Sequence, residues 1–422
     1  MSWHVTDAID ERLSFIAEWH GGEWRLAELC RRYGVSRKAG YRLIGRFAAE
    51  GVDGLKDRSH ARHHHPNATS AGALEAVLRA RAEHPHWGPK KLKAWLERRA
   101  AGLAAPGVTA PGVTAPGLVM PGLVMPGLVV PAASTIGLIL QRHGLTVRRR
   151  HRGRAVPSAG LSAPDAANDV WAMDFKGWFR TGDGTRCDPL SLSDLGSRYL
   201  LRVQALDRPD AAHVWPVLDA AFREFGLPRA MRSDNGPPFA SSGAGGLSTL
   251  AVQLIKAGVV PERIRPGKPQ ENGRHERMHR TLKQETASPP AASIAAQQRR
   301  FDAFRQEFNH ERPHEALDQQ TPADRFCASP RQYSGRLRSP EPDGADQVRK
   351  VRSNGEIRWA GQHVFISEAL IGEPVGLIER DDGRHDILYG PILLGQLSHQ
   401  GVFTKAKATH NKPPADVTHQ PG

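Results

Sequence analysis

Three acidic residues occupy positions where a carboxylate has no evident structural purpose. Asp174 interrupts the apolar strand pattern VWAMDFKGWF at 170–179, Asp234 follows a short strand pattern in RSDNGPPF, and Glu276 lies on a later helix pattern. An ionised carboxylate in such a place is costly unless it is paired or bound to a metal. Mg²⁺ and Mn²⁺ favour oxygen ligands and keep positions open for phosphate and water. The three residues therefore predict a site for two divalent ions about 3.5 to 4 Å apart, suited to in-line displacement at phosphorus.

The helix pattern around the third carboxylate also permits another metal chemistry. Residues 275–279 read HERMH, a match to H-E-x-x-H, in which two histidines one helical turn apart bind zinc and the glutamate acts as a base. Where the longer zinc-protease pattern requires Gly and His, this chain has Leu282 and Glu285. We therefore favour the carboxylate site, and we expect His275 and His279 to lie on the helix surface or to face DNA.

The segments that carry the three carboxylates resemble a known family. From WAMDFKGWF through RSDNGPPF to RPGKPQENGRHERMHRTLKQE, the chain is similar to the catalytic cores of bacterial insertion-sequence transposases, which are related to retroviral integrases. The resemblance continues into the helical segments in front and the β-rich segment behind, so it covers nearly the whole chain. It implies a ribonuclease H-like fold, an Asp-Asp-Glu triad of Asp174, Asp234 and Glu276 that is both catalytic and metal-binding, and two Mg²⁺ or Mn²⁺ ions as cofactors.

The interval between the second and third carboxylates is longer than in many members of this family. Between Asp234 and Glu276 lie 41 residues, whereas Glu271 would leave 36 and is a competitor. The family's glutamate follows a Pro-x-x-Asn-Gly-like turn and precedes a basic helix, and PQENGRHER puts Glu276 there. A Gly/Ser-rich insertion, ASSGAGG at 240–246, accounts for the excess.

Helical geometry adds a reason to place Glu276 in the site. Glu276, Arg280 and Lys283 recur at i, i+4 and i+7 and share one face, while Met278 and Leu282 lie on another stripe suited to packing. A carboxylate and two phosphate-seeking cations then point the same way. The candidate DNA contacts in this region are Lys268, Arg274, Arg277, Arg280 and Lys283.

Helical segments in front of the core predict DNA recognition. Apolar residues at helical spacing form three runs from residue 7, and the break YGVS ends one helix near Arg32 and offers Ser36 as the N-cap of the next. This pattern resembles a helix-turn-helix, in which the last helix enters the major groove. The residues expected near the groove are Arg37, Lys38, Tyr41 and Arg42.

The rest of the chain is organised around the central domain. A second helix-turn-helix pattern is interrupted by a five-residue Pro/Gly repeat, to which we assign no function, and the core reads as strands and helices of an α/β fold with a mixed sheet. Behind it, short apolar runs between NG, AG and DG turns predict a small five-stranded β-barrel. The expected boundaries are 7–58 for the first helix-turn-helix domain, 70–147 for the second unit with its repeat at 106–130, 148–168 for a basic and Pro-rich linker, 169–328 for the core, 348–398 for the barrel and 399–422 for a disordered tail.

The bulk composition agrees with a partner that is a polyanion. The chain has 422 residues, a formal net charge of +14 and a pI near 10.1. No apolar run approaches the roughly 20 residues of a membrane span, and the N-terminus lacks the pattern of a signal peptide. Three cysteines without a CxxC pair indicate reduced thiols. We therefore expect a cytoplasmic, nucleoid-associated protein without a membrane partner.

These features together predict a DNA transposase. It would bind the terminal inverted repeats of an insertion sequence, cleave at the 3′ end and transfer that end into target DNA, and joining two ends makes a homo-oligomer the expected active form. The alternative is a catalytically silent, transposase-derived DNA-binding regulator, which the presence of all three carboxylates disfavours.

Overall fold

The computed structural model describes residues 8–58, 68–102, 127–146, 161–162, 164–265 and 273–406, with only the backbone described for Gly273 and Arg274. It divides into a first unit up to Thr69 and a second unit from Ser70 onward. The repeat at 106–130, the linker at 148–168 and the tail at 399–422 lie mostly outside the described residues. Within the described ranges, no helix combines the length and the apolar character needed to span a bilayer.

The first unit contains three helices and a short 3₁₀ turn around a small apolar core, as the sequence predicts. The Ser36 hydroxyl accepts a hydrogen bond of 3.2 Å from the first turn of the third helix and caps it. Gly40 lies on the packed side of that helix, where a methyl group would lie 2.6 Å from Sγ of Cys30 and 3.2 Å from the Phe15 ring. Glycine is therefore what allows the helices to approach so closely. The elements are α1 (Ala8–His20), α2 (Leu26–Arg32), α3 (Arg37–Glu50) and η1 (Gly51–Leu55).

Three more helices open the second unit, where the sequence predicts its second helical segment. They enclose a core in which Trp87 is 1% exposed and Trp95 is 5% exposed. The His84 ring stacks on Trp87 with the ring centroids 3.7 Å apart. These helices are α4 (Ala71–Glu83), α5 (Pro89–Ala100) and α6 (Ala133–Arg142).

Charged contacts join α5 to the segment that follows the central domain's last helix. Arg98 holds Asp324 through two hydrogen bonds of 2.7 and 3.2 Å, and Lys90 lies 2.8 Å from Glu315. A bidentate arginine pair fixes orientation better than a single contact between long, exposed side chains. The second helical segment is therefore fastened to the core by side chains more than 200 residues apart in sequence.

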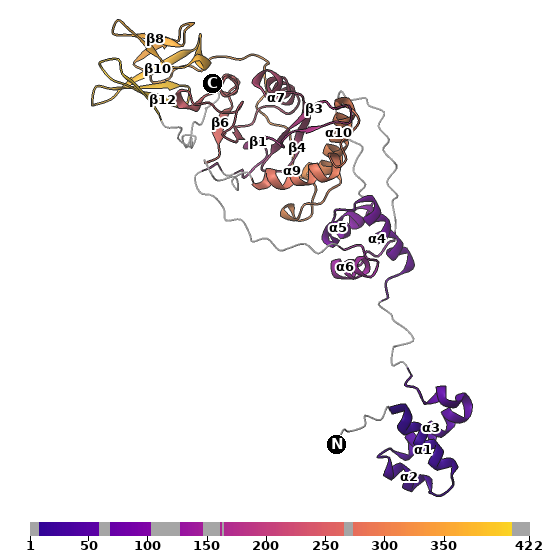
Figure 1. Ribbon diagram of the computed structural model, residues 1–422. Helices are drawn as coiled ribbons and strands as arrows, with labels where there is room; N and C mark the ends of the chain where they lie inside the picture. The colour runs from indigo at the N-terminus through magenta and orange to yellow at the C-terminus, as the bar shows by residue number, and fades with distance from the viewer. Residues whose placement is uncertain are drawn as a thin grey trace. The chain divides into compact units, whose positions relative to one another are not determined.

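A mixed sheet forms the centre of the second unit, as the sequence predicts (Figure 1). Its strands run in the order β4-β3-β1-β5-β6, with the short β2 paired to β3. Strands β1, β5 and β6 are parallel, and β3 pairs antiparallel with β1, β2 and β4. Strand β6 was not predicted; its Pro261, which lacks an N–H, is tolerated because β6 lies at the edge of the sheet. The strands are β1 (Val170–Phe175), β2 (Phe179–Arg180), β3 (Arg186–Asp194), β4 (Leu200–Leu206), β5 (Ala230–Ser233) and β6 (Val260–Arg263).

Helices cover both faces of this sheet. On one face, Trp171 and Met173 of β1 pack with Phe222 and other side chains of α7 and α8. On the other face, Met278 of α9 and Phe301 of α10 pack against β3 and β4. Since side chains alternate along a strand, Asp174 faces the second side of the sheet. The helices are α7 (Ala211–Phe225), α8 (Thr249–Lys256), α9 (Gly273–Thr286) and α10 (Ile294–His310).

The C-terminal part is all β, but its sheet is open. Five antiparallel strands run in the order β13-β12-β11-β10-β7, and β8 and β9 form a separate hairpin. In the described part of the chain the edge strands β7 and β13 do not pair with each other, so the predicted closed barrel is not confirmed. The elements are β7 (Gln347–Lys350), β8 (Glu356–Trp359), β9 (Gln362–Phe365), η6 (Glu368–Leu370), β10 (Pro374–Glu379), β11 (His385–Tyr389), β12 (Ile392–Leu397) and β13 (Phe403–Lys405).

The Gly/Ser-rich segment at 240–246 packs against this β-rich part. Its end forms η2 (Ala244–Gly246), where Gly245 has a φ of 60° and lies against Ile392 of β12. Arg263 at the end of β6 donates hydrogen bonds to the carbonyls of Gly245 and Gly246, and α8 completes the shared apolar core. Residues 244–247 thus form part of the surface on which the β-rich part packs.

Candidate active site

Two of the predicted carboxylates come from neighbouring parallel strands. The register of β1 and β5 pairs Val170 with Ala230 and Ala172 with Arg232. Continuing this register by two residues brings Asp174 beside Asp234, which directly follows β5. The carboxyl ends of parallel strands meet at one edge of the sheet, so the backbone alone places these two side chains together.

The chain after β5 makes a turn that is fixed by its own side chains. The Gly236 amide donates to Oδ1 of Asp234 at 3.1 Å, and Nδ2 of Asn235 donates to the Ile264 carbonyl at 2.7 Å. A methyl group on Gly236 would lie 3.4 Å from the Asp234 carboxylate, an ordinary van der Waals contact. The turn therefore helps to orient the Asp234 carboxylate.

The third predicted carboxylate lies on the exposed face of α9. Glu276, Arg280 and Lys283 are exposed, whereas Met278 and Leu282 are buried against α10 and the sheet. This division into two faces is the one expected from helical spacing. Glu276 therefore points away from the packed side of its helix, together with two cations.

Electrostatics link the three carboxylates. Burial and the neighbouring negative charge of Asp234 raise the pKa of Asp174 to about 7, and the charge of Glu276 adds to this rise. The positive charge of Lys176 lowers the pKa of Asp174. Among the residues that the structure describes, no group of three or more His, Cys, Asp or Glu side chains has the arrangement needed to hold a metal ion. The carboxylates are near enough to repel one another but are not gathered as ligands of one ion.

The expectation that His275 and His279 lie on the helix surface or face DNA is wrong. Both imidazoles are buried, at 1% and 5% exposure, between α9 and β3. Nε2 of His275 lies 2.7 Å and Nε2 of His279 lies 2.5 Å from the Ser191 hydroxyl, and Ser193 lies 3.1 Å from Nδ1 of His275. The pair fixes α9 against β3, directly beside Glu276.

The buried pair also touches the first carboxylate. Nδ1 of His279 lies 3.6 Å from Oδ2 of Asp174, and the Ser191 hydroxyl lies 3.2 Å from the Asp174 carbonyl oxygen. Burial lowers the pKa of His275 to about 4 and, together with nearby positive charge, lowers that of His279 to about 2. Both rings are thus neutral at neutral pH, and they link the strand carrying Asp174 to the helix carrying Glu276.

Sequence reasoning overlooked Ser191 and Ser193. In PLSLSD at 189–194 the two serines alternate with leucines, so period-two geometry places both on the face opposite the leucines. That alternation was a usable signal. Its partners could not be found without the packing of α9, which is separated from β3 by about 80 residues.

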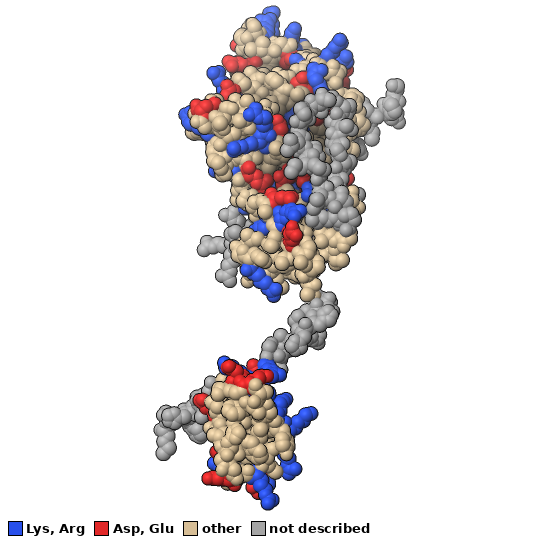
Figure 2. Space-filling model, turned by 90° about the vertical axis from the view of Figure 1, so that its right-hand side faces the viewer, with Lys and Arg blue, Asp and Glu red and all other residues tan. Residues whose placement is uncertain are grey.

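The predicted DNA contacts are exposed wherever their side chains are described. Arg37, Lys38, Tyr41 and Arg42 project from α3, and Tyr41 is 67% exposed. Figure 2 shows basic side chains projecting from one edge of the N-terminal unit. On α9, Arg277, Arg280 and Lys283 are exposed. Lys268, the side chain of Arg274 and the competitor Glu271 lie outside the described residues.

Family comparisons identify two kinds of domain in the chain. Family models described as an integrase core domain match residues 164–269 and 257–322. A homeodomain-like model matches residues 39–107, and a helix-turn-helix model matches residues 11–63. These matches agree with the resemblance seen in the sequence for the central core and for the helical segments in front of it; the β-rich segment behind the core lies outside the matched residues.

Similar curated proteins come from bacterial insertion elements. The chain is 30% identical over 191 residues to the uncharacterized 31.7 kDa protein of insertion element IS407 from Burkholderia multivorans, covering 44% of this chain and 66% of that protein. It is 28% identical over 188 residues to the uncharacterized 39.2 kDa protein of insertion element IS476 from Xanthomonas euvesicatoria, and this match covers 44% of this chain and 52% of that protein. The match thus spans less than two thirds of either relative's length.

The solved structures to which the chain is similar are distant. The HTLV-2 integrase catalytic core domain in complex with magnesium is 13% identical, with a TM-score of 0.30 over 38% of this chain and 97% of that one. The catalytic core domain of BIV integrase is 18% identical, with a TM-score of 0.29 over 37% of this chain and 92% of that one. At these values the likeness supports no conclusion about chemistry.

Proposed function

We propose that the protein is a DNA transposase. It binds the terminal inverted repeats of an insertion sequence, cleaves at the 3′ ends and transfers those ends into target DNA in a metal-dependent reaction. The observation that carries this proposal is the adjacency of Asp174 and Asp234 at the ends of two parallel strands, with Glu276 close enough to raise the pKa of Asp174.

The donor chemistry of the three carboxylates suits divalent ions, although their side chains are not gathered around one ion in this structure. Asp174, Asp234 and Glu276 offer only hard oxygen donors, which suit Mg²⁺ or Mn²⁺. The mutual repulsion that raises the pKa of Asp174 to about 7 is the cost that a bound cation relieves. Two ions at such a site supply activation of the attacking oxygen and stabilisation of the leaving oxygen at phosphorus. Asp174, Asp234 and Glu276 would together hold the ions; Asp174 lies beside Asp234, and the charges of both other carboxylates raise its pKa.

The chain's own residues position the reacting strand. Arg280 and Lys283 lie on the same exposed face of α9 as Glu276, so they place positive charge where phosphates would approach the carboxylates. Arg277 is exposed on a different side of α9, and we assign it to a further phosphate contact. Lys268 and Arg274 precede this helix and extend the same basic segment. His275 and His279 take no part in proton transfer in this scheme. Their contacts with Ser191 hold α9 in place on β3.

The N-terminal helices supply recognition of the element's ends. Arg37, Lys38, Tyr41 and Arg42 are exposed along the first turns of α3, the part of a recognition helix that meets base edges. We assign the second helical unit and the basic linker to further end and phosphate contacts. Because two ends must be joined, the active form contains at least two copies of the chain bound to DNA in the nucleoid.

A strand-transfer assay tests the proposal. Oligonucleotides carrying the inverted repeats that flank the gene are incubated with the full chain and Mg²⁺ or Mn²⁺. We expect joined products from the intact protein, and binding without products from Asp234→Asn. If the intact protein binds the same ends but yields no product with either ion, it acts as a regulator and the proposal is wrong.

A further inference from the structure

A buried ion pair lies in the sheet directly behind the candidate active site. Arg232 on β5 and Glu262 on β6 are partners in the register of these parallel strands, and they are 5% and 2% exposed. Nε of Arg232 donates to Oε2 of Glu262 at 2.7 Å. Arg232 also pairs with Ala172 of β1, so it lies on the same face of the sheet as Asp174. It precedes Asp234 by two residues, yet the proposed strand-transfer chemistry does not use the pair.

This ion pair holds the segment that leads into the core. The Ser162 amide donates to Oε1 of Glu262 at 2.9 Å, and the Ser162 carbonyl accepts from Nη2 of Arg232 at 2.7 Å. Both contacts are made by backbone atoms of Ser162, so they fix the path of the chain whatever the side chain. Ser162 belongs to the segment at 148–168 that joins the second helical unit to the core. Arg232, Glu262 and the Ser162 backbone thus form a clamp on this linker.

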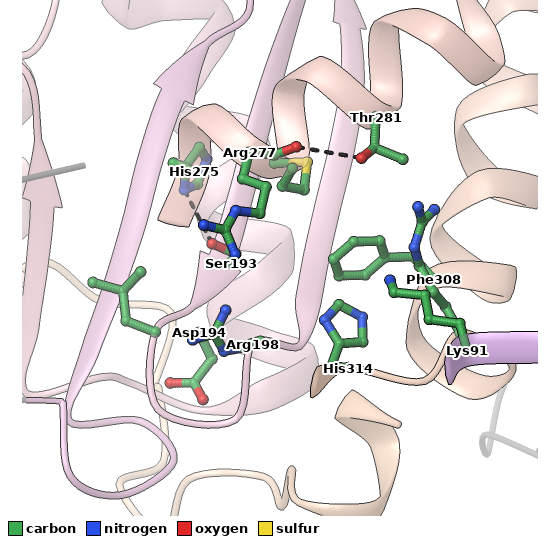
Figure 3. Close-up of a pocket in the computed structure, with 12 residues that line it drawn as sticks. Lys91, Ser193, Asp194, Arg198, His275, Arg277, Thr281, Phe308 and His314 are labelled. Carbon is green, nitrogen blue, oxygen red and sulfur yellow. Dashed lines mark hydrogen bonds between the residues drawn. The ribbon is translucent and has the colours of Figure 1, made fainter. Parts of the chain in front are cut away.

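The chain is held at two further points before β1 begins. A methyl group on Gly196, in the turn between β3 and β4, would lie 2.2 Å from the Ala166 carbonyl oxygen, so glycine permits this close approach. The Asn168 amide donates to Oδ1 of Asp194 at 2.9 Å, and Figure 3 shows Asp194 where β3 ends and this turn starts. The end of the linker is therefore fixed relative to the strand that carries Asp174.

Stability alone is a poor explanation of the clamp. A buried ion pair is a weak source of stability, because both charges lose their water. Strands β5 and β6 are also joined by their own backbone pairing, so strand pairing does not account for the ion pair either. The hydrogen-bonding groups that the pair has left over go to the linker, and charge-assisted hydrogen bonds of this kind specify geometry. The arrangement is suited to positioning.

We propose that the clamp positions the element's end for the reaction. The linker carries the second helical unit, to which we assign end contacts, and the clamp holds this linker on the strand that leads to Asp234. Recognition of the end by the helices is thereby coupled to placement of the terminal nucleotides at the carboxylates. The inference rests on the proposed function and deepens it. Arg232 and Glu262 are positioning residues, because they act through the linker and not on DNA.

Hydroxyl-radical footprinting of the full-length protein tests this proposal on duplexes that carry the inverted repeats flanking the gene. The helical units should protect the inner part of the repeat, and the core should protect its terminal nucleotides. Ser162→Pro removes the amide donor from the clamp, whereas Ser162→Ala keeps both backbone groups and is the matched control. The double variant Arg232→Met, Glu262→Leu removes the ion pair and leaves the linker sequence unchanged. Strand transfer with Mg²⁺ and unfolding midpoints are measured in parallel.

The expected result separates the two parts of the footprint. Ser162→Pro and the double variant should protect the inner repeat with a dissociation constant within about twofold of that of the intact chain. Both should lose protection of the terminal nucleotides, and correct strand transfer should fall about tenfold or more, because a small misplacement of the reacting groups is costly. Ser162→Ala should match the intact chain. A role in stability alone would lower the unfolding midpoint without separating the two parts.

Terminal protection in Ser162→Pro equal to that in Ser162→Ala would overturn the proposal. Normal terminal protection in a folded double variant, or its absence from the intact chain, would do the same. If the double variant does not fold, Ser162→Pro decides the question, since it leaves the buried side chains unchanged.

The same panel separates this inference from the proposed function. The expected footprints in a protein whose intact form transfers no strand sink the proposed function alone. Strand transfer with the same terminal protection in every variant sinks the clamp alone. A chain that protects no part of the repeat sinks both.

Discussion

Nε2 of His275 on α9 lies 2.7 Å from the hydroxyl of Ser191 on β3. Ser191 is also the cross-strand partner of Asp174, and His275 immediately precedes Glu276. One buried hydrogen bond therefore connects the backbone neighbours of the first and third candidate metal ligands. The distance between these carboxylates depends on how α9 is seated on the sheet, and this contact is part of what seats it.

Removing the Ser191 hydroxyl should loosen this connection. In Ser191→Ala both buried imidazoles lose a partner, so we expect the free energy of unfolding to fall by about 1 to 3 kcal/mol. Strand transfer should fall further than stability alone explains, because Glu276 is less well positioned. Urea unfolding and strand transfer are measured side by side. The matched variant Ser193→Ala removes only the 3.1 Å contact with His275 and should do less; equal effects of the two would count against this role.

Acid should destabilise the core through its buried histidines. The pKa of His275 is lowered to about 4 and that of His279 to about 2, while an unfolded histidine titrates near about 6.5. Below pH 6.5 these two histidines bind protons in the unfolded chain but not in the folded chain, so their contribution to stability is full above that pH and declines as the pH falls. Asp174, whose folded pKa is raised to about 7, contributes in the opposite direction. We expect a loss on the order of 2 kcal/mol per histidine between pH 7 and pH 5.

Urea unfolding at several pH values measures this decline. His275→Gln should be less stable at pH 7 and should show a shallower dependence on pH. An identical slope in the intact protein and in His275→Gln would show that the buried pair does not titrate as described.

Two glycines of α3 should respond in opposite directions to alanine. Gly45 faces open space, so Gly45→Ala should stabilise the first unit by up to about 1 kcal/mol through helix propensity. Gly40 faces Cys30 and Phe15, so Gly40→Ala should destabilise it relative to Gly45→Ala by about 1 to 3 kcal/mol. Calorimetry of the full chain and binding to inverted-repeat DNA measure the two effects. Similar midpoints for both variants would disprove the tight packing of α3.

Docking of the β-rich C-terminal part should depend on Gly245. Its φ is 60°, and a methyl group there would lie 3.0 Å from Ile392, so Gly245→Ala combines backbone strain with a clash. Gly184 has a φ of 81° and nothing within 4 Å, so Gly184→Ala reports the strain alone, on the order of 1 to 2 kcal/mol. We expect Gly245→Ala to cost more and to accelerate proteolysis in the segment at 329–347. Equal protease sensitivity of the two variants would contradict the docking role of the insertion.

Local patterns in the sequence predicted most of the helices and the mixed sheet. The Ser36 cap, the two faces of α9 and the position of Asp174 on a strand all follow from periodicity and capping within a few residues. What the sequence could not give depends on contacts between distant segments. His275 and His279 read as surface or DNA-facing groups until their serine partners on β3 are seen, and the ASSGAGG insertion reads as a spacer until β12 is found packed on it.

The β-rich part shows a second limit of pattern reading. Alternating apolar residues and Gly-containing turns correctly indicated short strands, but whether a sheet closes depends on the pairing of its edges, which no local pattern specifies. Strand β6 was missed for a related reason, because Pro261 weakens the strand signal although an edge position accommodates it.

The most direct test of the central claim compares two glutamates in the strand-transfer assay with Mg²⁺. Glu276→Gln should lower the rate by about 100-fold or more, because a ligand that contributes several kcal/mol of charge stabilisation is lost, while binding to the inverted repeats is kept. Glu271→Gln, the competing position, should retain activity within a few fold. Loss of activity in Glu271→Gln with normal activity in Glu276→Gln would contradict the assignment of Asp174, Asp234 and Glu276 as the catalytic triad.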